Sequence, residues 1–424
     1  MDASRSRTSS SGDPSPALGG RDARLYVLAS GVGSFGLGVA AFYLNFVYRA
    51  LGFDDLAIGA LVAAQAAGGL AGTWPAARLA RSRSRRAAIL LGGVVTAAGI
   101  VGILVVDALG AQLAAAALLG AGGIVVYSAG TALLADATAT GDRPRRFGQQ
   151  IAIGTIAAFA AAYVAGQLAD PVARALDATT SSLVTVRALV ALGGIVAAAS
   201  ALPILLVRAM PVPRGSLEAP ARRGLLLRFG TVEAIFGFGA GSFLPFVNLF
   251  FVDRFGLDFA TLGVVLGAIA VGGSFGALLH GIHLAPRMGQ LRSVVAVQLL
   301  SVPFAVAAGV VPVAMAVAGL LTIRAGLMYG SSSTYRAYTL SSFSPAERAG
   351  VAAILTIAWS ATAAVGSVLS GAVRAQLGDV GWTINLVTLA AAYSVAAIVT
   401  LALFREHEPR GDAVVVEALR DSPL

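Results

Sequence analysis

Two ionisable side chains lie inside long apolar stretches of this sequence. Arg324 is about eleven residues from either end of its stretch, and Glu233 follows Arg228 by little more than one helical turn. A charge near the centre of a bilayer costs about 2.5–3.5 kcal/mol on insertion scales, so both positions require an explanation. Arg324 fits a fixed positive charge that holds an anionic substrate or a partner carboxylate, or a structural Arg satisfied by carbonyls of a neighbouring helix. Glu233 fits a proton-coupling acid, or a carboxylate that reaches the interface or is stabilised by a helix dipole.

Uncharged side chains could complete a binding site. Asn45 and Asn248 occupy matching places near the ends of two apolar stretches, where they could bind a substrate or pair with each other between helices. Aromatic residues in the stretches could wall an amphiphilic cavity or could simply fill the core. They are Tyr43, Tyr127, Phe236, Phe243, Tyr329, Tyr335 and Trp359.

The composition excludes several function classes. The chain has no Cys and only three His, so no thiolate chemistry and no Ser-His-Asp arrangement can be identified. His280 and His283 lack a third ligand, so we expect no metal site, no cofactor and no enzyme activity. All thirty basic residues are Arg, which excludes a P-loop Lys. The net charge of +9 comes from Arg residues in short loops, which does not indicate nucleic-acid binding.

The elements that must position these residues are membrane-spanning helices. Of the 424 residues 57% are hydrophobic and only 12% are charged, and the mean hydropathy is +0.82. Such a surface must meet lipid, where each segment has to satisfy its own backbone and therefore forms a helix. Twelve stretches are near the ~20 residues that a crossing requires. They are 25–48, 56–79, 87–106, 109–135, 148–169, 183–207, 229–252, 259–280, 293–310, 313–336, 350–374 and 382–404.

Loop charges predict the orientation of the chain. Arg residues concentrate in the loops after the even-numbered stretches, and Asp residues in the opposite loops. The positive-inside rule therefore places the even loops and both termini in the cytoplasm. We expect a disordered tail at 1–22, a six-helix bundle at 23–207, a cytoplasmic linker at 208–228, a second bundle at 229–404 and a tail at 405–424. The richness in Ala, Gly, Val and Arg is typical of a prokaryotic genome of high GC content.

The second half of the chain repeats the first. Gly52, Asp54 and Gly59 match Gly256, Asp258 and Gly263 at a constant offset of 204 residues. Asp142-Arg143 and Glu347-Arg348 form another pair at an offset of 205. An apolar chain made of two such copies is typical of a secondary transporter with internal repeats.

These features resemble the major facilitator superfamily over nearly all of residues 25–404. The family's basic loop between helices 2 and 3 is matched by PAARLARSRSRR (75–86), which keeps Leu79, Ala80, Arg85 and Arg86 but has Arg81 at the acidic position. The second half keeps Leu284, Ala285, Arg287 and Gly289, with Pro286 in place of the acid.

The resemblance implies an all-α, polytopic membrane protein of twelve transmembrane helices in two six-helix bundles with pseudo-twofold symmetry. It also implies that helices 1, 4, 7 and 10 line a central cavity. The missing loop acids leave a cytoplasmic latch without its usual members, unless other residues provide it. The gating candidates are Asp136, Asp142, Arg143, Glu347, Arg348, Arg85 and Arg287.

The sequence therefore predicts a monomeric secondary transporter of the cytoplasmic (inner) membrane. Its expected action is proton-coupled export (antiport) of a small amphiphilic organic molecule by alternating access, with Glu233 as the titrating acid. Uptake of a small organic anion, held by Arg324, and an uncoupled facilitator remain alternatives. A non-transporting receptor or scaffold on the same fold is a further alternative.

Overall fold

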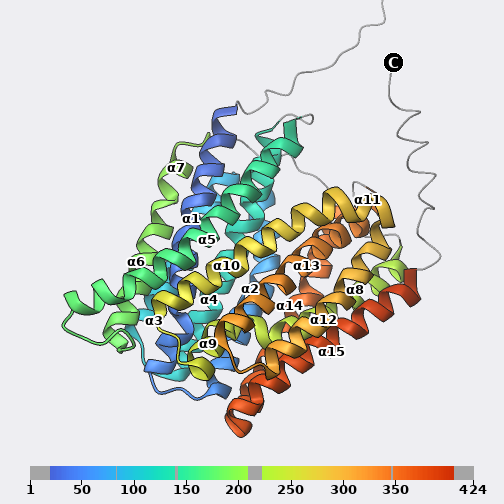
Figure 1. The fold of residues 1–424 in the computed structure, drawn as a ribbon. Coiled ribbons are helices and arrows are strands. Elements are labelled where there is room, and N and C mark those ends of the chain that lie inside the picture. The colour runs from blue at the N-terminus through green and yellow to red at the C-terminus, as the bar shows by residue number, and fades with distance from the viewer. Residues whose placement is uncertain (1–19, 83, 139–141, 209–221, 345–346, 405–424) are drawn as a thin grey trace, which may run out of the picture.

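A computed structural model describes residues 20–82, 84–138, 142–208, 222–344 and 347–404 of the chain (Figure 1). Residues 1–19 and 405–424 of the predicted tails, and residues 209–221 of the predicted linker, lie outside the described residues. Helices make up nearly all of the described part, which contains no strand. Twelve helical segments in it are long and apolar enough to cross a membrane. The predicted all-α fold with twelve membrane helices is confirmed.

The N-terminal half contains six crossings. Its helices are α1 (Gly20–Ala50), α2 (Asp55–Ser82), α3 (Arg85–Val105), α4 (Leu109–Asp136), α5 (Arg143–Ala175), α6 (Leu183–Ala199) and the short α7 (Ala201–Leu205), which continues the sixth crossing. Within this half α1 packs against α5 and α6, and α4 packs against α2 and α3.

The C-terminal half contains the other six crossings. Its helices are α8 (Arg223–Phe243), α9 (Val247–Phe255), α10 (Phe259–Leu279), α11 (Ala285–Met288), α12 (Gln290–Val310), α13 (Ala314–Ser341), α14 (Arg348–Leu377) and α15 (Asp379–Phe404). A 3₁₀ turn (Leu244–Phe246) joins α8 to α9, and a π-helical turn (His280–Leu284) joins α10 to α11. The predicted stretches 293–310 and 313–336 are separate helices, because α12 ends at Val310 and α13 begins at Ala314.

The repeated glycine and aspartate residues have the same structural role in both halves. Gly52 and Gly256 follow the ends of α1 and α9 with positive φ angles of 81° and 65°, which favour glycine. Asp54 and Asp258 then cap the next helix by accepting the backbone N–H of Ala57 and Thr261, each at 2.8 Å. The bonds to Thr261 lower the pKa of Asp258, which lies in a loop between crossings. The repeated motif is therefore a helix stop followed by a helix start.

The last repeated pair, Gly59 and Gly263, lies where the two halves meet. A Cβ on Gly59 of α2 would collide with the carbonyl of Ser367 in α14, and one on Gly263 of α10 would collide with the carbonyl of Ala162 in α5. The α2–α14 and α5–α10 pairs are the main contacts between the halves, and they are equivalent under exchange of the two halves. Small residues at both crossings allow the backbones to approach closely.

The loops divide the bundle into two ends. The Asp55 end contains the loops at 51–54, 106–108, 176–182, 256–258 and 311–313 and the turn at Gly378, and the Arg85 end contains the opposite loops and the outer termini of α1 and α15. Figure 1 shows the start of α1 together with α7 and α11 at the Arg85 end. The loop charges predict that the Arg85 end is cytoplasmic.

Candidate functional site

A cavity of about 640 Å³ lies between the two halves. Helices α1, α2, α3 and α4 line it from the N-terminal half, and α8, the 3₁₀ turn and α14 from the C-terminal half. Its described lining is mostly apolar and includes no Asp, Glu, Arg, Lys or His. The polar or amphipathic side chains along it are Asn45, Tyr48, Gln65, Thr73, Thr96, Tyr127, Thr356, Trp359, Ser360 and Ser367. Hydroxyl, amide and aromatic groups without charge suit an uncharged, amphiphilic small molecule.

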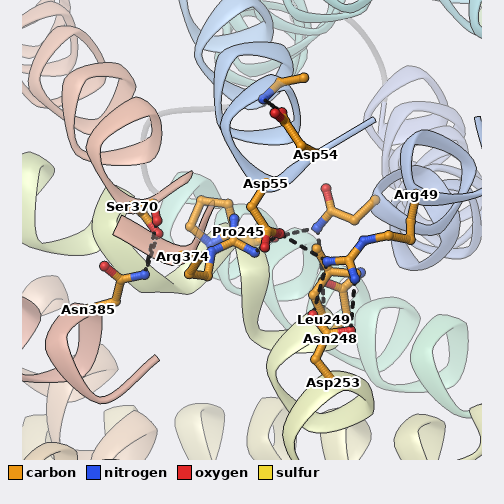
Figure 2. Close-up of polar contacts among 12 residues, drawn as sticks. Arg49, Asp54, Asp55, Pro245, Asn248, Leu249, Asp253, Ser370, Arg374 and Asn385 are labelled. Carbon is orange, nitrogen blue, oxygen red and sulfur yellow. Dashed lines mark hydrogen bonds and ion pairs between the residues drawn. The ribbon is translucent and has the colours of Figure 1, made fainter. Parts of the chain in front are cut away.

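Two asparagines, Asn45 and Asn248, form a pair at the cavity, and Figure 2 shows Asn248 near Pro245 and Asp253. Asn45 of α1 donates from Nδ2 to the Asn248 side-chain oxygen at 2.9 Å and to the Pro245 carbonyl at 2.8 Å. Asn248 of α9 donates in return to the Phe42 carbonyl at 3.0 Å. Both asparagines are 5% exposed, and Asn45 also lines the cavity. They therefore form the interhelical pair that the sequence left open, and Asn45 can also contact a bound molecule.

Replacing Asn248 with Ala should lower the stability of this closed arrangement. The change leaves an Asn45 N–H group and the Phe42 carbonyl without their partner, and an unsatisfied buried group costs about 1–3 kcal/mol. We expect a lower midpoint of thermal unfolding in detergent. Ser274→Ala is the control, because the Ser274 hydroxyl donates to the Ala270 carbonyl of its own helix. Equal shifts in the two variants would contradict a special role for the asparagine pair.

A chain of four charged residues joins the halves beyond the asparagines (Figure 2). Arg49 of α1 pairs with Asp253 of α9 at 3.0 Å and with Asp55 of α2 at 2.9 Å. Asp55 also accepts from Arg374 of α14 at 2.7 Å. The Arg49–Asp253 and Asp55–Arg374 pairs cross from one half to the other. These two ion pairs hold the two halves together at the Asp55 end.

Arg374 is the most buried of these four charged residues. Its side chain is 1% exposed, against 23% for Asp55 and 41% for Arg49. The guanidinium carbon lies 4.4 Å from the ring centre of Phe246 and 4.5 Å from that of Trp382, so two aromatic faces hold it in place. Its Nε and Nη2 are buried without a hydrogen-bond partner among the described residues. Asp55 is the only carboxylate paired with it there, so their pair should carry much of the closing energy.

The charged chain follows the twofold relation of the fold at one of its two contacts between the halves, but not at the other. Asp253 lies 204 residues after Arg49, the repeat offset, so this pair joins equivalent positions of the two halves. The α5–α10 contact, equivalent to the α2–α14 contact, is built differently: Gln167 of α5 donates to the Ala260 carbonyl at 3.4 Å beside the crossing of Gly166 and Gly263. One contact is closed by an ion pair, and the other by a neutral hydrogen bond and close backbone packing.

The two ionisable residues of the apolar stretches lie in the C-terminal half but outside the cavity lining. Arg324 of α13 is 5% exposed, and its guanidinium carbon lies 5.1 Å from the ring centre of Tyr393 in α15. Its Nε and Nη2 have no hydrogen-bond partner among the described residues. Glu233 is half-buried on α8, one turn before Phe236, whose ring contacts those of Tyr335 and Tyr393. Neither residue touches the cavity between the halves in this conformation.

The aromatic candidates divide into two groups. Tyr127 of α4 and Trp359 of α14 line the cavity from opposite halves. Phe243 is 1% exposed in the core, where its ring contacts that of Phe250. Tyr329 is 61% exposed and lies against Gly273 where α13 meets α10, outside the cavity lining.

The gating candidates lie at the Arg85 end, and four of them form contacts within their own half. Arg85 pairs with Asp136 at 3.1 Å inside the N-terminal half. Glu347 accepts from the Ser344 hydroxyl at 2.7 Å, and Arg348 donates to the Leu340 carbonyl at 2.9 Å, both inside the C-terminal half. Asp142 and Arg287 are exposed, and the side chain of Arg143 lies outside the described residues. At the Asp55 end, in contrast, the charged chain joins the halves.

Several residues of the site were not singled out by the sequence analysis. Arg49 and Arg374 were not candidates, and Asp55 and Asp253 counted only among the loop acids that predict the orientation. The repeat could have indicated Arg49 and Asp253, because an Arg and an Asp at equivalent positions of a twofold fold can meet at its axis. Among the described residues no group of three His, Cys, Asp or Glu side chains could hold a metal ion.

Comparisons with known proteins agree with the geometry. The model of the Major Facilitator Superfamily matches residues 26–350. No curated protein matches the sequence. The chain is similar to the nucleoside transporter NupG, with a TM-score of 0.70 and 14% identity over 91% of this chain and 99% of that one.

Two further solved structures show the same fold. A bacterial homologue of the human lysosomal transporter Spinster, in an inward-facing and unoccupied conformation, gives a TM-score of 0.70 and 15% identity over 92% of this chain and 98% of that one. The human organic anion transporter MFSD10 gives 0.61 and 14% over 90% and 99%. At such identities the similarity concerns the fold.

Proposed function

The chain belongs to the major facilitator superfamily, a family of membrane transporters, and we propose that it moves an uncharged, amphiphilic small organic molecule by alternating access. The proposed direction is export across a cytoplasmic membrane, with Glu233 as the residue that couples export to protons. The observation that carries the proposal is the cavity between the halves, lined without charge and closed at one end.

The closed end supports alternating access. All four residues of the charged chain lie at the Asp55 end, and the asparagine pair lies just inside them. Past the crossing at Gly59, α2 and α14 both line the cavity, with Gln65 and Thr73 on α2 and Ser360 and Thr356 on α14. If the Arg85 end is cytoplasmic, as the loop charges predict, this conformation is closed to the outside. A second conformation would break the charged chain and close the Arg85 end instead.

Uptake of an organic anion is the second candidate, and Arg324 is the residue that favours it. Its Nε and Nη2 are buried without a hydrogen-bond partner among the described residues, which favours the binding of an anion. The residue lies against Tyr393 and outside the cavity lining in this conformation, so the candidate requires a movement of α13 or α15 that exposes it. The uncharged lining favours the neutral substrate.

A ligand screen followed by a flux assay tests the proposal. Uncharged compounds, nucleosides among them, and organic anions are first tested for thermal stabilisation of the purified protein, because a ligand stabilises the state that binds it. Stabilising compounds are then followed across sealed proteoliposomes. The proposal expects uncharged amphiphiles to bind and to cross. Compounds that bind and never cross would show a receptor instead, and a response to anions alone would favour Arg324 as the binding group.

Filling the cavity should abolish transport without unfolding the protein. Ala66 of α2 is half-buried and lines the cavity, so Ala66→Trp places an indole where the substrate would lie. We expect binding and flux to fall by roughly tenfold or more, since the pocket loses much of its free volume. The control is Val94→Trp, because Val94 of α3 is 65% exposed on the surface of the bundle. Unchanged flux in Ala66→Trp would place the path elsewhere.

A further inference from the structure

A second hollow lies on the surface of the C-terminal half. It is an open groove of about 810 Å³ along α8 and α15, with Thr362 of α14 on its wall. It shares no lining residue with the cavity between the halves. Side chains in it such as Val387 and Val395 are more than 40% exposed. Because α8 and α15 cross the membrane, these exposed apolar side chains face hydrocarbon rather than water.

The dimensions of the groove suit a single acyl chain. Along α15 its lining extends from Thr383 to Val395, which is about 18 Å at a rise of 1.5 Å per residue. One leaflet contributes about 15 Å, half of the ~30 Å hydrocarbon core. The groove is therefore about as long as one leaflet is deep.

A cation lies at the end of the groove nearest to the Arg85 end. Arg228 precedes Thr231, a lining residue, by about one helical turn, so the two side chains lie on the same face of α8. Its Nη1 donates to the Leu403 carbonyl at 3.4 Å, which places the guanidinium between the start of α8 and the end of α15. The same two helices form the groove. The long bond uses one of five N–H donors, and the side chain is exposed.

The opposite end of the groove is less suited to an anion. Arg254 lies there and donates to the Gly309 carbonyl at 2.8 Å and to the Thr383 hydroxyl at 3.4 Å. Its guanidinium carbon also lies 5.8 and 5.6 Å from the ring centres of Phe250 and Phe255. Arg254 is thus held by the protein, whereas Arg228 is exposed at the surface.

We propose that the groove binds one anionic phospholipid, with an acyl chain along α8 and α15 and the phosphate on Arg228. A phosphate accepts several N–H groups of a guanidinium at once, and the apolar wall removes the chain from other lipids. Anionic lipids are attracted to basic residues at the cytoplasmic surface, which is the predicted side of Arg228. This site is separate from the proposed transport path and does not depend on the substrate.

Native mass spectrometry of the full-length protein tests the proposal. The purified chain is incubated with phosphatidylglycerol or with phosphatidylcholine, and the bound lipid is counted as the detergent is removed. We expect one phosphatidylglycerol to be retained in preference to phosphatidylcholine. Arg228→Gln should weaken retention roughly fivefold, the effect of one Arg near a charged lipid surface. Ala391→Trp should also release the lipid, because Ala391 lines the groove and is exposed.

Two control variants distinguish lipid binding in the groove from nonspecific lipid binding elsewhere on the surface of the protein. Arg145→Gln removes an exposed charge from α5 at the same end of the molecule, and Val101→Trp adds an indole to the exposed face of α3. Both should retain the lipid as the unmodified protein does. Retention in Arg228→Gln equal to that in Arg145→Gln would overturn the proposal. So would equal retention of the two lipids, or loss of lipid in Arg254→Gln but not in Arg228→Gln.

Discussion

Replacing Arg374 with Gln should open the Asp55 end of the molecule. The change removes the ion pair with Asp55, which crosses between the halves at 2.7 Å, and takes a cation away from between Phe246 and Trp382. Breaking a buried pair costs about 3–5 kcal/mol, and the partial exposure of Asp55 places this pair at about 3 kcal/mol or below. A shift of that size changes the ratio of two conformations by up to roughly a hundredfold.

The protein has no Cys, so a single introduced thiol can report this opening without competing reactions. Ser367→Cys introduces one thiol at a position that is 1% exposed, lines the cavity and lies against Gly59 at the α2–α14 contact. An impermeant maleimide added from the Asp55 side should react slowly in this background. The rate should rise strongly when Arg374→Gln is added.

The matched control is Arg174→Gln, which removes an exposed Arg from the last turn of α5, also at the Asp55 end of the molecule. It should leave the labelling rate unchanged. Asp55→Asn should raise the rate at least as much as Arg374→Gln, because Asp55 pairs with Arg49 as well as with Arg374. The double variant should do little more than Asp55→Asn alone, because the Asp55–Arg374 pair is already lost in that variant. Additive effects, or slow labelling in Arg374→Gln, would show that the pair does not close this end.

The repeat made the fold predictable from sequence. The repeated Gly and Asp residues are short-range signals, because each one acts within the turn between two successive helices. They are Gly52 and Asp54 in the first half and Gly256 and Asp258 in the second. Periodic apolar stretches then give the crossings, since lipid permits only helices there. The twofold relation follows from the offset and needs no knowledge of individual contacts.

The site was less predictable because it depends on the direction of side chains. Arg324 was expected near a substrate from its depth alone, but depth does not say which face of α13 it occupies, and its guanidinium lies against Tyr393. Trp359 and Tyr127, chosen for their type, do line the cavity. Arg374 was passed over because it is near the end of its helix, where an Arg is ordinary. Its role in joining the halves depends on its ion pair with Asp55, which is more than three hundred residues away in sequence.

Replacing Glu233 with Gln should uncouple transport from the proton gradient. Glu233 is half-buried on α8, and the groups that act on it electrostatically lie on two other helices: Arg336 and Tyr335 on α13 and Tyr393 on α15. A Gln keeps the size of the side chain and cannot take up a proton. In proteoliposomes with a pH difference of one unit, a one-proton antiporter can concentrate its substrate up to about tenfold. The Gln variant should only equilibrate it.

Exchange without a gradient distinguishes coupling from damage to the protein. Substrate counterflow requires binding and alternation but no net proton movement, so Glu233→Gln should retain it. Glu233→Asp keeps a titratable group at the position and should keep part of the gradient response. Loss of counterflow together with gradient-driven flux would mean that Glu233 supports the structure of α8 instead. Flux in Glu233→Gln that still follows the pH difference would assign coupling to another group, and His280, buried beside Thr334 where α10 meets α13, would be the next residue to replace.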